Sequence, residues 1–117
     1  MLRRLYVRDD AFVELLLADA NANEIASHLD GKTHALVRLG ALIAMDAAPP
    51  SYLAAIESAE RCSASSDEIV GCLIAVLPVV GVARVVSAAP KLGLALGYDL
   101  EAALEFHPRV ADDDVAS

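Results

Sequence analysis

Hydrophobic residues recur at helical spacing through most of the chain. From residue 9 to residue 20, apolar side chains fall at positions i, i+3 and i+4, namely Phe12, Leu15 and Leu16. This pattern predicts a short amphipathic helix that ends in the segment Asn21 to Asn23. No stretch alternates apolar and polar residues with a period of two for long enough to form a sheet.

Polar capping residues and prolines divide the middle of the chain into further helices. Asp30 or Thr33 can cap a helix that begins after the turn at Gly31. Pro49 and Pro50 stop this helix and can begin the next one, because the missing N–H of proline costs nothing in the first helical turn. The apolar positions of these two helices are Leu36, Leu39, Ala41 and Ile43, followed by Tyr52, Leu53, Ile56 and Ala59.

The most apolar part of the chain follows a capping box. Ser65 stands three residues before Glu68, the spacing typical of a helix N-terminus. From Ile69 onward the sequence is apolar on nearly every helical face, so we expect burial at the centre of the domain or in an oligomer interface. Pro78 and Pro90 should kink or segment this helix.

Length and composition fit one small helical domain. The 117 residues predict a single domain, with its core at about residues 29–104. Apolar residues make up 56% of the chain and aromatic residues 4%, so small aliphatic side chains must build the core. Asp99 can cap a last short helix, and residues 108–117 form an acidic tail that we expect to be flexible. The predicted fold is all-α, a compact bundle of five to seven helices.

Charge and cysteine usage exclude several classes of function. The net charge of −8 argues against nucleic acid as a partner, because phosphate contacts need a clustered basic face. No signal peptide and no apolar run long enough to cross a membrane is visible, so we expect a cytoplasmic protein. Cys62 and Cys72 are ten residues apart and lack zinc-ligand spacing, so we expect two reduced thiols and no bound metal or other cofactor.

The order of three segments resembles a known family. The segments "LDGKTHALVRLGALIAMDA", "SYLAAIESA" and "SSDEIVGCLIAVLPVVGVARVVSAAPKL" resemble the carboxymuconolactone decarboxylase-like family, whose wider relatives include alkylhydroperoxidase D. The resemblance covers about Leu29 to Leu104. It implies an all-α fold of the alkylhydroperoxidase-D-like type that assembles as a trimer or hexamer. It also implies an active cavity lined by the helix that carries the family's cysteines.

The redox residues of that family are absent at the matching positions. The family's glutamate falls on Ala35. Its two cysteines fall on Ala48 and Ser51 and its histidine on Ala55, or, with the register shifted by one, on Pro49, Tyr52 and Ile56. The histidine of the decarboxylase branch has only Val76, Val79 and Gly81 near its position. Peroxide or disulfide turnover needs a thiolate and a resolving thiol, so we expect no redox activity.

Among the charged residues, Arg84 says most about a possible binding site. It interrupts a long apolar run, so its guanidinium must pair with a carboxylate or reach a cavity. Glu57 and Glu68 are the carboxylates we consider as partners, and a ligand-anchoring role is equally open. Lys91 follows Pro90 and is expected to be exposed, since only a desolvated lysine is a reactive amine.

Other polar residues admit both a functional and a structural interpretation. His34 and Arg38 lie four apart on one helix and could form an anion site with Asp46, or a solvated or intersubunit polar face. Ser51 could be a polar group at a pocket mouth or a first-turn residue. Tyr52 could donate a hydrogen bond to a ligand or lie at an interface with its ring buried.

Two functions of different classes remain open from the sequence. The first is binding or conversion of a small carboxylate or lactone in an intersubunit cavity, with Arg84 or Arg38 as the anion anchor. Conversion would need a general acid, for which Asp46 and Glu57 are the candidates. The second is a homo-oligomeric helical scaffold or accessory protein that kept the fold and lost the chemistry.

Overall fold

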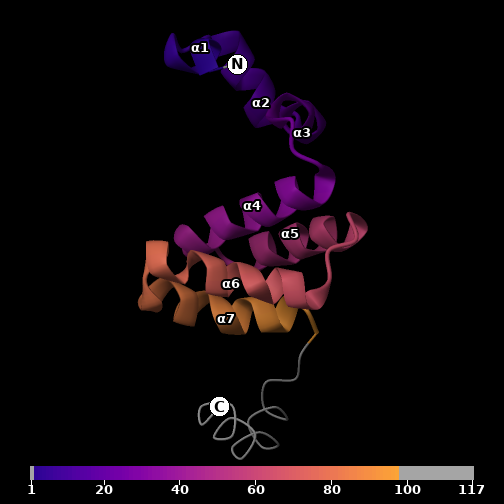
Figure 1. Cartoon of the computed structure of the whole chain (residues 1–117), viewed down its shortest axis with the longest axis vertical. Helices are drawn as coiled ribbons and strands as arrows, with labels where there is room; N and C mark the ends of the chain where they lie inside the picture. Colours follow the sequence, from indigo (N-terminus) through magenta and orange to yellow (C-terminus); the bar gives the residue numbers. More distant parts are fainter. Residues whose placement is uncertain (1, 98–117) are drawn as a thin grey trace, which may run out of the picture.

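The computed structural model describes residues 2–97, which form seven α-helices and no strand. In chain order these are α1 (Leu2–Tyr6), α2 (Asp10–Ala18), α3 (Ala20–Ser27), α4 (Gly31–Ala44), α5 (Pro49–Arg61), α6 (Ser66–Val80) and α7 (Val82–Ala95). The prediction of an all-α bundle of five to seven helices is confirmed. Helices α4 to α7 form the compact bundle, and α1 to α3 extend from it (Figure 1). The last helix and acidic tail expected from the sequence lie outside the described residues.

Helices α4, α5 and α6 begin at the capping residues and prolines that the sequence pattern indicated. The Asp30 carboxylate accepts a hydrogen bond from the Thr33 N–H at 2.7 Å and caps α4. Two prolines occupy the first two positions of α5. The Ser65 hydroxyl and the Glu68 carboxylate close a reciprocal capping box at the start of α6, with distances of 3.1 and 3.0 Å. These predictions of helix starts are confirmed.

The N-terminal part contains a helix that the hydrophobic pattern missed. The helix predicted over residues 9 to 20 is α2, which ends at Ala18, before the expected segment Asn21 to Asn23. Helix α3 begins two residues later. Asp19 makes this possible because its carboxylate accepts hydrogen bonds from the N–H groups of Asn21 and Ala22. The asparagines of this segment therefore lie in the first turns of a new helix, although the sequence predicted only the end of the preceding one there.

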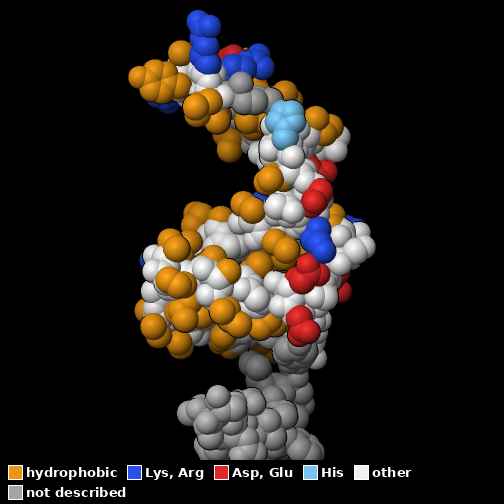
Figure 2. Space-filling model, in the orientation of Figure 1, with side chains coloured by type: hydrophobic (Ala, Val, Ile, Leu, Met, Phe, Trp, Pro, Cys, Tyr) orange, Lys and Arg blue, Asp and Glu red, His pale blue; other side chains and the backbone are white. Residues whose placement is uncertain are grey.

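The apolar run breaks at a glycine. Pro78 and Pro90 both lie inside helices, and neither ends one. The break falls at Gly81, whose φ of 89° is in the region that favours glycine, and it separates α6 from α7. Much of the run is exposed in the single chain, including Ile74 at 71% and Val79 at 85%. Hydrophobic side chains accordingly spread over the visible face of the bundle (Figure 2).

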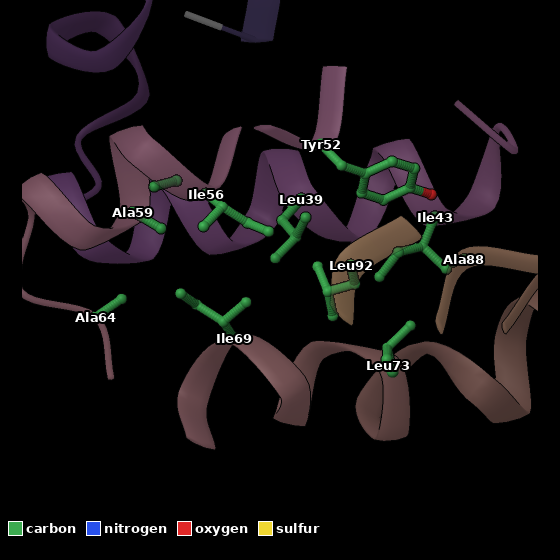
Figure 3. Packing of buried hydrophobic residues seen from close by; sticks show 11 residues of the cluster. Leu39, Ile43, Tyr52, Ile56, Ala59, Ala64, Ile69, Leu73, Ala88 and Leu92 are labelled. Atoms are coloured by element: carbon green, nitrogen blue, oxygen red, sulfur yellow. The ribbon is translucent and has the colours of Figure 1, made fainter. Parts of the chain in front are cut away.

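The core lies between the four bundle helices. Leu39 of α4, Ile56 of α5, Ile69 of α6 and Leu92 of α7 are at most 1% exposed and point toward one another (Figure 3). Each side chain of this size contributes about 1.5–3 kcal/mol when it is fully buried. The core therefore supports the pair α4–α5, on which the candidate site is built. Within residues 2–97, no helix combines the length and the apolar character needed to cross a bilayer.

Candidate functional site

A cavity of about 430 Å³ opens between α4 and α5. Half of its lining residues are alanine, and three are polar. The lining residues are Ala35, Arg38, Ala41 and Leu42 of α4, and Ser51, Ala54, Ala55 and Ser58 of α5. The volume falls within the range of about 300–1,000 Å³ that small-molecule sites occupy. Small side chains on both facing helices create this space, because alanine leaves room where larger residues would close the groove.

The polar groups of the cavity are one cation and two hydroxyls. Arg38 comes from α4, while Ser51 and Ser58 are seven residues apart on α5 and share its cavity side. Two helical turns separate the serines by about 10 Å along the axis. Sequence reasoning missed Ser58, although its seven-residue spacing from Ser51 was the available signal. No salt-bridge partner of Arg38 is found within residues 2–97.

The start of α5 supplies no backbone donors to this cavity. Pro49 and Pro50 have no N–H, and the Ser51 N–H donates to the Ala48 carbonyl at 3.0 Å. A helix N-terminus ordinarily attracts anions through its free N–H groups. Here an anion would depend on the Arg38 guanidinium and the serine hydroxyls.

One of the two registers considered from the sequence converges on the cavity. Ala35, Ser51 and Ala55 all line it. The residues of the shifted register do not, because Tyr52 and Ile56 are at most 1% exposed within the core. No thiol, imidazole or carboxylate is among the lining residues, so the cavity contains no general base for the Ser51 hydroxyl.

Tyr52 fixes the wall of the cavity from behind. Its hydroxyl donates to the Leu42 carbonyl at 3.2 Å. Burial, and secondarily the negative charge of Asp46, raise the pKa of this phenol above its ordinary value. The hydroxyl therefore stays protonated and is used within the fold, and the ring is not available to a ligand.

His34 is separated from the polar groups around Arg38. Its side chain is buried, and Nε2 lies 2.7 Å from the Asn23 side-chain oxygen, which connects α4 to α3. It does not line the cavity. The structure therefore does not bring His34 and Arg38 into one anion site with Asp46.

Asp46, between α4 and α5, is the centre of a second polar cluster, and its partners all lie on α7. Its carboxylate accepts hydrogen bonds from the Ser87 hydroxyl at 2.6 Å and from Lys91 Nζ at 3.1 Å. The Arg84 guanidinium lies 3.7 Å away. The hydrogen bonds from Ser87 and Lys91, then the charges of Lys91 and Arg84, hold the pKa of Asp46 below its ordinary value.

This cluster changes the roles expected of three charged residues. Arg84 pairs with Asp46. Glu68 binds Lys32 at 3.0 Å across α4 and α6, and Glu57 forms no salt bridge within residues 2–97. Arg84 is half-exposed, so its charge is solvated as well as paired. Lys91 is about one-quarter exposed, and its ammonium also donates to the Ala47 carbonyl at 3.0 Å.

Neither carboxylate considered as a general acid reaches the cavity between α4 and α5. Asp46 is engaged by α7, and Glu57 is exposed on α5 without being part of the lining. Among the site residues predicted from the sequence, the structure brings Arg38 and Ser51 together at the cavity. It brings Arg84 and Asp46 together in the second cluster.

The two cysteines are free and lie away from the cavity. Cys72 lines an apolar groove between α4 and α6, and its partial burial raises the pKa of the thiol. The Cys62 sulfur lies 3.0 Å from the position that a Cβ on Gly31 would take, so it packs against the start of α4. Within residues 2–97, no group of three His, Cys, Asp or Glu side chains could hold a metal ion.

Comparison of the chain with protein-family models, with curated proteins and with solved structures found no match.

Proposed function

We propose that the chain binds a small organic carboxylate in the cavity between α4 and α5, with Arg38 as its anchor. The observation that carries the proposal is an exposed guanidinium, without a salt-bridge partner in the described chain, that lines a cavity of about 430 Å³ together with two hydroxyls. A guanidinium presents parallel N–H donors that match a carboxylate. The alanine walls suit a short aliphatic body.

The proposal keeps the carboxymuconolactone decarboxylase-like resemblance and its small-carboxylate or lactone chemistry. The convergence of Ala35, Ser51 and Ala55 on one cavity supports it, because in one of the two registers the family's glutamate, its second cysteine and its histidine fall on these positions. The first cysteine of that register falls on Ala48, which is not part of the lining. Alanine at two of the three positions removes the acid–base groups. The function that this lining supports best is binding of the ligand without redox turnover.

The alternative is a homo-oligomeric scaffold, for which the exposed apolar surface of α6 and α7 is the supporting observation. A trimer or hexamer would agree with the resemblance. The two unpaired cysteines suit a reducing compartment such as the cytoplasm.

Titration calorimetry at about 0.15 M salt, where exposed charges are screened, tests the ligand proposal. Succinate should bind, and its neutral diamide should not. Arg38→Met should weaken succinate binding by about tenfold or more, since a charged hydrogen bond is worth about 1.5–3 kcal/mol. Arg84→Met is the matched control, because Arg84 belongs to the Asp46 cluster. Equal losses in the two variants, or no binding by the parent protein, would refute the proposal.

A further inference from the structure

Helices α6 and α7 leave a broad apolar surface in water. The sequence carries no charged side chain between Glu68 and Arg84. The outer face, as we define it, consists of the exposed hydrophobic residues Ile74, Leu77 and Val79 of α6 and Val82 and Val86 of α7, which are 37–85% exposed. Hydrophobic side chains of the bundle gather on the face visible in Figure 2, with charged ones toward one edge. Exposed apolar side chains in this number on neighbouring helices indicate an interaction site.

The N-terminal arm, Leu2–Ser27, is a second apolar surface that stays exposed within the described residues 2–97. The arm meets the bundle chiefly through a small contact between α3 and α4. Its exposed large hydrophobic residues are Leu2, Leu5, Tyr6, Val7, Leu15, Leu17 and Ile25. Hydrophobic side chains line the side of the arm that overhangs the bundle in Figure 2, and the arm stands clear of the bundle there.

The arm is nevertheless an ordered unit. The Arg4 guanidinium lies 4.6 Å from the centre of the Phe12 ring and 3.4 Å from Asp9, which ties α1 to α2. The Asn23 amide donates to the Leu16 carbonyl at 3.1 Å and ties α3 to α2. Its exposed side chains are therefore presented on a defined scaffold.

The arm and the bundle together form an elongated shape. The radius of gyration is 16.9 Å, compared with about 13 Å for a compact domain of this length. At roughly 100 Å² for each exposed hydrophobic side chain, the arm and the outer face together hold on the order of 800 Å² or more. This is about the area that each partner contributes to a standard stable interface.

We propose that the arm of one copy packs on the outer face of a second copy of the chain. The charges that favour this pairing are Arg3 on α1 and Asp67 in the first turn of α6, which have no salt-bridge partner within residues 2–97. Arg4 and Glu68 are already paired, with Asp9 and Lys32 respectively. Each copy gives one arm and receives one, so the contact closes as a reciprocal dimer or as a ring. This inference rests on the proposed self-association and is independent of the ligand in the α4–α5 cavity.

Two double variants test the pairing by light scattering. Tyr6→Asp with Leu17→Asp places charges on the arm, and Val79→Asp with Val82→Asp places them on the outer face. All four side chains are 67–87% exposed in the single chain, so each variant should fold and give the parental circular dichroism spectrum. Met45→Asp with Leu53→Asp is the matched control, because these residues are exposed outside both surfaces.

The parent protein and the control should be oligomeric, and both test variants should be monomeric. An arm variant that stays assembled would overturn the inference in favour of contacts between outer faces. A face variant that stays assembled would overturn it in favour of contacts between arms. A monomeric parent protein would refute the proposed self-association itself.

Mixing the two test variants provides the decisive arm-to-face readout. The arm variant retains an intact outer face and the face variant retains an intact arm, so one complementary contact remains possible. We expect a particle of twice the monomer mass in sedimentation velocity at about 100 µM of each variant, and none for either variant alone. Absence of that particle in the mixture would overturn the inference.

Discussion

The hydroxyl of Tyr52 donates a hydrogen bond to the carbonyl oxygen of Leu42 across 3.2 Å. This bond joins the first turn of α5 to α4 directly behind the cavity, because Leu42 is part of the lining and Tyr52 is buried in the core. The residue that sequence reasoning offered as a ligand contact therefore supports the wall of the site.

Replacing Tyr52 by phenylalanine should destabilise the fold modestly. The ring and its packing remain, and the lost hydrogen bond costs about 1 kcal/mol in the free energy of unfolding, measured in urea. Tyr6→Phe is the control, since Tyr6 is 87% exposed and its change should leave stability as it was. Equal stability of the two variants would contradict the role assigned to the Tyr52 hydroxyl.

The Asp46 cluster should make stability depend on pH in the acid range. Because the folded pKa lies below the ordinary value of 3.8, the ionised carboxylate stabilises the fold above the unfolded pKa. This contribution is lost as the pH falls through the folded pKa. Asp46→Asn does not titrate, and asparagine accepts the positive φ of 53° at this position.

The stability difference between the parent protein and Asp46→Asn should therefore be constant above about pH 5 and shrink below about pH 4. Thermal unfolding from pH 2.5 to 7 measures it. The lowered pKa values of Asp30 and Glu68 affect both proteins alike and cancel in the difference. A stability difference between the two proteins that does not change with pH would show that the negative charge of Asp46 does not stabilise the fold.

The capping box should hold the start of α6. Ser65→Ala removes the acceptor of the Glu68 N–H and should cost about 1 kcal/mol in the free energy of unfolding. Ser66→Ala one residue later is exposed and belongs to the helix, so it should be nearly neutral. Similar costs for the two serines would indicate that the cap contributes nothing beyond helix propensity.

Neither cysteine should serve a redox function. The raised pKa of Cys72 leaves less thiolate near neutral pH than in an ordinary cysteine, so we expect slower alkylation than for a free thiol at the same pH. A Cys62→Ser, Cys72→Ser double variant should retain the succinate affinity of the parent protein. Rapid alkylation of Cys72 at pH 7, or loss of binding in the double variant, would contradict this assignment.

The sequence predicted the features that depend on neighbouring residues, above all the starts of helices. Asp30, Pro49 and Ser65 begin helices through contacts within four residues, so their roles are visible in the pattern. The all-α fold follows from the same signals. Which of the neighbouring residues Ser51 and Tyr52 lines the cavity depends on the packing of α5 on α4, and the sequence left both open.

The sequence could not predict contacts between distant helices. Asp46 meets Ser87 and Lys91, which are 41 and 45 residues further along the chain, because α7 returns to the end of α4. That return depends on how the bundle closes, and helical periodicity does not specify it. For this reason the sequence offered Glu57 and Glu68 as possible partners of Arg84 beside a ligand-anchoring role, and did not indicate Asp46, with which Arg84 pairs in the structure.

The central claim is that the cavity between α4 and α5 holds a small carboxylate, and nuclear magnetic resonance of the isotope-labelled protein tests it most directly. Titration with succinate at about 0.15 M salt should shift the backbone amide signals of Ala35, Ser51, Ala55 and Ser58 with one common saturation curve, and the Arg38 guanidinium signals with them. The amides around Arg84 and Lys91 should not move on that curve. Shifts that centre on the Asp46 cluster, or that grow linearly over all arginines without saturating, would contradict the claim.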